Sequence, residues 1–178
     1  MRLPGAILLF AASLFAAGSA LACDLPGAGA ERLALKTVRP VVGDDVRLTA
    51  GYGLRRHPLL VTTKMHLGID WSAPPGTPVI AAAAGRVVEA GPRGEYGNAI
   101  LIEHGGGWYT FYSQLSRFAE IYPGACVAAG AEIAYVGSTG LSSGPHLHFE
   151  IRHNGTHLDP LTFRPSSEPE PQEVEDKG

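Results

Sequence analysis

The chain has 178 residues and a formal net charge of −3, with 14 Lys and Arg against 17 Asp and Glu. Acidic residues gather in the last dozen positions, so the rest of the chain is close to neutral and has no basic patch of the kind that binds nucleic acid. The length suits one domain with a single hydrophobic core.

The first predicted element is a secretory signal over residues 1–22. Arg2 is followed by an apolar run from Ala6 to Ala17 and by the small-x-small triplet Ala20-Leu21-Ala22. The alternative is a retained membrane anchor, but the run is shorter than the span of about 20 residues that a bilayer requires. We therefore expect an exported protein, in the periplasm or cell envelope, without a stable membrane span.

Two cysteines, Cys23 and Cys126, give an even count. Disulfides persist in exported proteins, so a Cys23–Cys126 bridge is expected, with two free thiols as the alternative. Leu21-Ala22-Cys23 also partly resembles a bacterial lipoprotein cleavage box, although Ala20 stands where that motif favours Leu. Lipidation of Cys23 is therefore a second, competing possibility.

Residues 23–50 are expected to form an N-terminal leader that packs along the domain. Glu31 to Lys36 could form a helical turn, and Val41-Val42 and Val46 to Leu48 could be short strands on either side of a turn at 43–45.

From Gly51 onward, glycines separate short β-branched and apolar runs that predict strands. The expected strands are 79–83, 86–90, 99–103, 108–112, 131–136 and 147–152. Ala81 to Ala84 could favour a helix by propensity, but Pro78 and Gly85 bracket that run too closely. We predict an all-β domain, a compact antiparallel sandwich or barrel, over residues 51–163. Residues 164–178 predict a disordered acidic tail.

The run at 144–152 contains two histidines at alternate positions. In a strand, His146 and His148 would share one face, and Leu147 and Phe149 would enter the core. Paired imidazoles often begin a metal site, and a catalytic zinc usually takes three protein ligands. His66 and Asp70 are candidates for the remainder.

His66 and Asp70 lie four residues apart in an alternating run. A straight strand would separate them by about 13 Å, which is too far for bonds of about 2.0–2.2 Å to one metal ion. Gly68, midway between them, would have to allow a bend. Taken alone, the two residues would more often be a surface pair than ligands.

Several motifs resemble the lysostaphin-type, or LytM-like, zinc endopeptidases, which cut peptide cross-links in bacterial cell walls. The resemblance covers roughly Gly51 to Phe163 and includes GYGLRRHP at 51–58, HLGIDWSAPPGTPV at 66–79, GRVVEAG at 85–91, YGNAILIEHGGG at 96–107 and VGSTGLSSGPHLHFEIRHNG at 136–155. It implies one zinc ion held by His66, Asp70 and His148, with His146 as a catalytic histidine. It also implies a β core with the site in a groove, and peptidoglycan peptides as substrates.

The sequence departs from this family at residue 114. Where the family has a further histidine in a Tyr-x-His-Leu-Ser-like strand, FYSQLS at 111–116 has Gln114. A glutamine cannot carry a proton at neutral pH, but its amide can donate a hydrogen bond to a developing oxyanion. Gln114 is therefore expected to act as a neutral donor.

The other histidines are weaker candidates. His57 could line the groove, His104 is expected at a turn, and His153 and His157 are expected to face solvent beside a tight turn at Asn154-Gly155. Three hypotheses remain: an exported zinc endopeptidase; an impaired module that binds wall peptides or regulates another hydrolase, because of Gln114; and a structural or carbohydrate-binding β-domain, which would leave the spaced ligand motifs unexplained.

Overall fold

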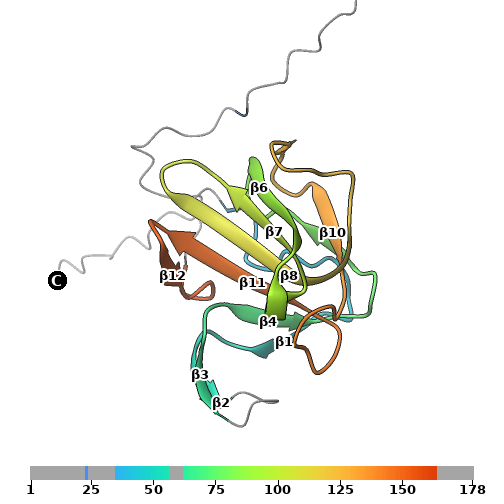
Figure 1. Ribbon diagram of the computed structural model, residues 1–178, viewed down its shortest axis with the longest axis vertical. Coiled ribbons are helices and arrows are strands. Elements are labelled where there is room, and N and C mark those ends of the chain that lie inside the picture. Colours follow the sequence, from blue (N-terminus) through green and yellow to red (C-terminus); the bar gives the residue numbers. More distant parts are fainter. Residues whose placement is uncertain (1–22, 24–34, 57–61, 164–178) are drawn as a thin grey trace, which may run out of the picture.

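The computed structural model describes residue 23, residues 35–56 and residues 62–163, and the regular secondary structure of these ranges is almost entirely β-strand (Figure 1). The expected all-β class is confirmed. Among these residues no helix is long and apolar enough to cross a membrane. The elements are β1 (Arg47–Ala50), β2 (Gly53–Arg56), β3 (Thr63–His66), β4 (Ile69–Ser72), β5 (Pro78–Ile80), β6 (Gly85–Pro92), a 3-10 helix η1 (Gly94–Tyr96), β7 (Asn98–Glu103), β8 (Trp108–Phe118), β9 (Cys126–Val127), β10 (Glu132–Val136), β11 (His146–His153) and β12 (Thr156–Leu158).

Ten of these strands form one antiparallel sheet in the order β1-β4-β11-β8-β7-β6-β9, with β10 paired to β5 and β8, and β12 paired to β11. The other two, β2 and β3, form a separate two-stranded sheet beside it (Figure 1). Strand β11 therefore lies between β4 and β8, where residues distant in sequence meet.

The core follows the alternation of the sequence. In β11, Leu147, Phe149 and Ile151 are fully buried, because every second side chain of a strand points to the same face. They pack against apolar residues of the neighbouring strands, including Ile69, Ile100, Ile102, Tyr112, Leu115 and Ile133. The opposite face of β11 is left for His146, His148 and Glu150.

Strand β8 is longer than the expected 108–112 because it bends rather than ends. Its first half pairs with β11 as far as Ser113, and its second half pairs with β10 from Leu115. Gln114 lies between the two and has a positive φ of 66°. A non-glycine residue in this backbone region is uncommon and often marks a functional position.

Strand β5 is shorter than the expected 79–83. Ala82 is buried, and its N–H donates to the hydroxyl of Tyr112 at 2.8 Å instead of to a strand. The run of alanines at 81–84 is neither strand nor helix. Small side chains here let the backbone enter the core, where a side-chain hydroxyl satisfies its polar groups.

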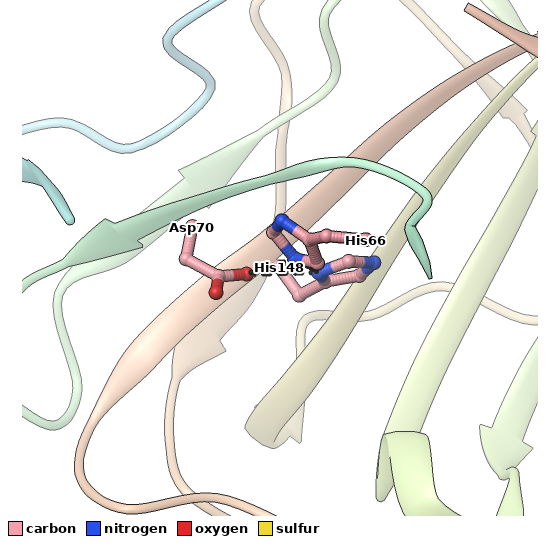
Figure 2. A group of neighbouring side chains, drawn as sticks. All are labelled: His66, Asp70 and His148. Carbon is pink, nitrogen blue, oxygen red and sulfur yellow. Dashed lines mark hydrogen bonds and ion pairs between the residues drawn. The ribbon is translucent and has the colours of Figure 1, made fainter. Parts of the chain in front are cut away.

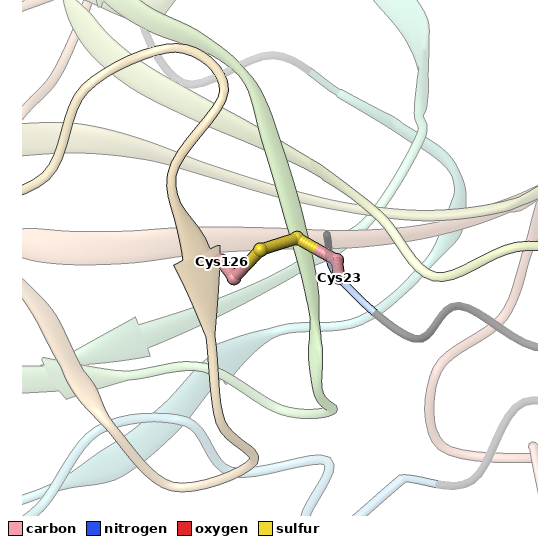
Figure 3. The surroundings of a disulfide bond; sticks show 2 residues. All are labelled: Cys23 and Cys126. Carbon is pink, nitrogen blue, oxygen red and sulfur yellow. A yellow bond between two sulfur atoms is a disulfide. The ribbon is translucent and has the colours of Figure 1, made fainter. Parts of the chain in front are cut away.

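The segment before the motif region packs onto the domain. Val41 is buried and forms a bridge with Val79, and β1 pairs with β4. Cys23 is joined by a disulfide to Cys126 in β9, with a Cα–Cα distance of 5.5 Å (Figure 3). The expected bridge is confirmed, and in this form the sulfur of Cys23 is not available to a lipid. The predicted signal and the predicted acidic tail lie outside the described residues. So do residues 31–34 of the expected helical turn, and its last two residues, 35 and 36, are not helical.

The expected tight turn at Asn154-Gly155 is confirmed. It joins β11 to β12, and both residues have positive φ, 48° and 80°. Two consecutive residues in this region are typical of a two-residue hairpin turn.

Candidate metal centre

The structure brings His66, Asp70 and His148 together (Figure 2). Asp70 in β4 and His148 in β11 are direct cross-strand partners. His66 is the last residue of β3, and the chain bends through Leu67-Gly68 before β4 begins. This is the bend that the spacing required.

Gly68 is needed here for space. A Cβ on it would lie 2.8 Å from Cγ of Glu150 and 2.9 Å from the backbone carbon of Phe149, and closer still to the carbonyl oxygen of Phe149. Only a residue without a side chain lets the bend pack this closely against β11.

Three donor atoms of the cluster converge on one point. His66 Nε2 lies 3.1 Å from both Asp70 Oδ1 and His148 Nδ1, and Asp70 Oδ1 lies 2.8 Å from His148 Nδ1. Ligands about 2.0–2.1 Å from a tetrahedral ion are about 3.3 Å apart. Two of the observed separations are about 0.2 Å shorter than that value and the third is about 0.5 Å shorter, so a small expansion of the cluster would fit the donors to a small divalent cation.

Hydrogen bonds away from the cluster determine which nitrogen of each imidazole is free. His66 Nδ1 lies 2.6 Å from the carbonyl oxygen of Gly51, and His148 Nε2 lies 2.9 Å from Glu150 Oε1. Because a carbonyl or carboxylate oxygen only accepts, both nitrogens carry a proton. The nitrogens that face Asp70 share protons with its Oδ1, and a metal ion that displaced these protons would find the lone pairs of His66 Nε2 and His148 Nδ1 directed at it.

The second carboxylate oxygen of Asp70 is paired as well. Arg55 in β2 donates to Asp70 Oδ2 at 3.1 Å. Burial by itself raises the pKa of Asp70, but hydrogen bonds from His148 and His66 outweigh burial and hold the pKa well below its ordinary value. Asp70 is therefore ionised, and its charge complements a cation.

His146 lies beside the three donors without joining them. Its Nδ1 is 2.8 Å from the carbonyl oxygen of Gly144, while its Nε2 is 3.9 Å from Asp70 Oδ1. The Gly144 contact places the proton on Nδ1, which leaves Nε2 as a free acceptor facing the cluster.

Gln114 is buried at the edge of the same groove, and its amide connects η1 to the loop that contains Gly140. Its Nε2 donates to the carbonyl oxygen of Glu95 at 3.2 Å, and its Oε1 accepts from the N–H of Gly140 at 2.8 Å. An amide nitrogen carries two protons. One N–H of Gln114 therefore remains beyond the Glu95 contact.

Sequence reasoning missed Arg55 and Glu150. Glu150 is fully buried, with Oε1 on His148 and Oε2 at 2.6 Å from an Nη of Arg152. Burial by itself raises the pKa of Glu150, but the hydrogen bond and charge of His148, and then the charge of Arg152, lower it. The alternation that paired His146 with His148 would have pointed to Glu150, two positions further on the same face.

Two hollows adjoin the cluster. One, of about 190 Å³, is lined by residues that include Lys64, Tyr96 and Gln114. The other, of about 400 Å³, extends past Ser72 and Ser142. Both are bordered by Arg55, Asp70, Leu141 and His146. The cluster thus lies in the first hollow, which adjoins the second along these four shared residues.

The remaining histidines are not part of the cluster. His104 follows β7 as expected but is buried, and burial lowers its pKa to about 4. His153 stacks on Trp108 with ring centroids 4.0 Å apart, and His157 lies 3.2 Å from Glu150 Oε2. Both residues were expected to face solvent, and both are half-buried. His57 lies outside the described residues.

The proteins that resemble this chain in sequence and in structure include several peptidases. The chain is 46% identical over 116 residues to the DD-carboxypeptidase/endopeptidase Mpg of Neisseria meningitidis serogroup B, which covers 65% of this chain and 26% of Mpg. The chain therefore spans about a quarter of that relative.

Solved structures agree with this likeness. A zinc containing peptidase from Vibrio cholerae superposes with a TM-score of 0.65 at 31% identity, over 71% of this chain and 39% of the other. The catalytic domain of lysostaphin from Staphylococcus simulans superposes with a TM-score of 0.58 at 37% identity, over 65% of this chain and 89% of that domain. Residues 64–160 match the family described as Peptidase family M23, so this chain belongs to that family.

Proposed function

We propose that the protein is an exported zinc metalloendopeptidase that hydrolyses peptide bonds in the stem or cross-link peptides of bacterial peptidoglycan. The convergence of His66 Nε2, Asp70 Oδ1 and His148 Nδ1 within 3.1 Å of one another carries the proposal. Two imidazoles and one carboxylate are a donor set that binds zinc and leaves a further coordination position open.

A zinc ion at this position would polarise the scissile carbonyl and lower the pKa of a water molecule towards 7. His66, Asp70 and His148 would hold the ion, and Arg55 would keep the Asp70 carboxylate oriented through Oδ2. The fixed orientation of these ligands means that little reorganisation is needed during the reaction.

His146 is the proposed general base and acid. Because Nδ1 is committed to Gly144, Nε2 can accept a proton from the attacking water and return it to the leaving amine. The proposed role of Gln114 is to present its remaining N–H to the oxyanion that develops on the scissile carbonyl.

The groove supports cleavage within a chain rather than at its end. Since the hollow that holds the cluster continues into a second hollow past Asp70, the substrate can extend beyond the cluster along the groove. An endopeptidase requires this arrangement. The relative Mpg is named as both a carboxypeptidase and an endopeptidase. The reaction products must therefore be identified to distinguish cleavage at the end of a peptide from cleavage within it.

The test is digestion of defined muropeptides. The purified protein, processed at Ala22 and loaded with zinc, should release fragments whose masses identify the bond cut, and His146→Ala should not. The single variants His66→Ala, Asp70→Ala and His148→Ala should each lose zinc by metal analysis. Stoichiometric zinc in all three would refute the ligand assignment.

The second candidate function is a zinc-bearing module that binds wall peptides or regulates another hydrolase. The observation that favours it is Gln114, whose amide is bound to Glu95 and Gly140 and cannot shuttle a proton. If the zinc-loaded wild type cuts no muropeptide and Gln114→His does, this function replaces the first.

A further inference from the structure

Glu150 is a buried charge for which the proposed mechanism has no use. It lies in β11 two residues after His148, on the same face, and is completely inaccessible to solvent. Burying a carboxylate is costly unless it is paired and hydrogen-bonded. Its partners therefore indicate what it does.

The two oxygens of Glu150 have different partners. Oε2 accepts from Arg152 Nε at 2.8 Å and Arg152 Nη at 2.6 Å, and lies 3.2 Å from His157 Nε2. Oε1 accepts from Nε2 of His148 at 2.9 Å. Arg152 thus holds the carboxylate through one oxygen, and the other oxygen is directed at His148.

The contact with Glu150 determines whether Nδ1 of His148, the nitrogen that faces the cluster, can offer a lone pair to a metal ion. When a metal ion takes the place of the proton shared with Asp70, the ring is neutral and carries one proton, and an acceptor at Nε2 keeps that proton away from Nδ1. Nδ1 is the atom that lies 2.8 Å from Asp70 Oδ1 and 3.1 Å from His66 Nε2. Without an acceptor at Nε2, the proton could move to Nδ1 and the ring could rotate out of line.

Packing holds Glu150 in place. Its Cγ lies directly beneath Gly68, where any Cβ would come within 2.8 Å of it. The bend between His66 and Asp70 therefore passes close over the side chain of Glu150 and leaves no room for it to move towards Gly68.

We propose that Glu150, anchored by Arg152, is a positioning residue that sets the tautomer and ring orientation of His148 for metal binding. The proposal rests on the proposed function insofar as it assigns a metal ion to the cluster. Partners of this kind typically contribute 10- to 100-fold to metal affinity.

The experiment compares the zinc affinity of the wild type, Glu150→Gln and Glu103→Gln by competition with a chromogenic chelator. Thermal unfolding of each metal-free protein is measured alongside. Glu103 is a matched control because it lies in β7, outside the groove residues. Zinc should bind about 10- to 100-fold more weakly to Glu150→Gln, and Glu103→Gln should bind zinc as the wild type does.

A second measurement needs no variant and covers the case in which Glu150→Gln does not fold. In zinc-loaded wild type, long-range ¹H–¹⁵N correlation spectra should place the His148 proton on Nε2 and the metal on Nδ1. The opposite tautomer would overturn the proposal. So would a Glu150→Gln protein with lowered thermal stability and wild-type zinc affinity, because Glu150 would then be only structural. A wild type that binds no zinc would instead refute the proposed function.

Discussion

Protonation of His104 should lower the free energy of unfolding at mildly acidic pH. The imidazole is 3% exposed, with Nδ1 2.7 Å from the carbonyl oxygen of Ala84 and Nε2 2.7 Å from Thr110 Oγ1. The hydroxyls of Thr110 and Tyr112, 2.9 Å apart, continue this buried network. The neutral ring satisfies both neighbours, whereas a charged ring would have to be buried in the core.

The magnitude follows from the pKa. Burial lowers the pKa of His104 from 6.5 to about 4, although the hydrogen bond to Ala84 opposes the shift. Between pH 6.5 and pH 4 the imidazole of His104 binds a proton in the unfolded chain but not in the folded protein. The contribution of His104 to the free energy of unfolding is therefore fully present above pH 6.5 and is lost as the pH falls towards 4. The loss is about 2 kcal/mol between about pH 7.5 and about pH 5, and about 3 kcal/mol in full.

Urea unfolding of the wild type and of His104→Gln at several pH values measures the contribution of His104 to the free energy of unfolding. The carboxylates and the other histidines titrate alike in both proteins, so the difference between the two free energies of unfolding isolates His104. That difference should shrink by about 2 kcal/mol from about pH 7.5 to about pH 5. A difference that does not change with pH would show that His104 is not buried as a neutral ring.

Three further predictions concern the groove and its supports. Gly68→Ala should lower the free energy of unfolding by about 1–3 kcal/mol and weaken zinc binding. Gly91→Ala is the control and should do neither, because its Cβ would meet open space. Equal losses of stability in the two variants, measured by calorimetry, would exclude the steric argument. Cys126→Ser should reduce the free energy of unfolding by about 2–4 kcal/mol because the bridge spans 103 residues, with zinc content unchanged; loss of zinc would mean that the bridge supports the site directly. Gln114→Ala should lower muropeptide cleavage about 10²- to 10³-fold by loss of a donor and keep zinc stoichiometric, and undiminished turnover would remove Gln114 from the mechanism.

The strand pattern of the domain could be predicted because it depends on local alternation. Leu147 and Phe149 are buried and His146 and His148 share the other face, as the period of two requires. The pairing order of the strands could not be predicted in the same way. It depends on contacts between distant segments, such as the Asp70–His148 pair that is 78 residues apart in sequence.

The candidate site was predictable in its donors but not in its supports. The donor set His66, Asp70 and His148 followed from the resemblance to a known family, because spacing alone would have favoured a surface pair for His66 and Asp70. Arg55 reaches Asp70 from a separate sheet, and no motif connected the two residues. The contacts of Gln114 also depend on a local backbone conformation, φ 66°, that no residue preference indicates for glutamine.

The division of the proposed ligands between two sheets would give a bound metal ion a mechanical role. His66 ends β3 in the two-stranded sheet, whereas Asp70 and His148 belong to the ten-stranded sheet. An ion bound to all three would cross-link the sheets and fasten the wall that carries Arg55 and Lys64 onto the floor of the groove. Removal of the ion by a chelator would then loosen the contact between the two sheets as well as remove the metal. If the proposed function holds, the metal-free protein should therefore bind wall peptides more weakly and also fail to cut them.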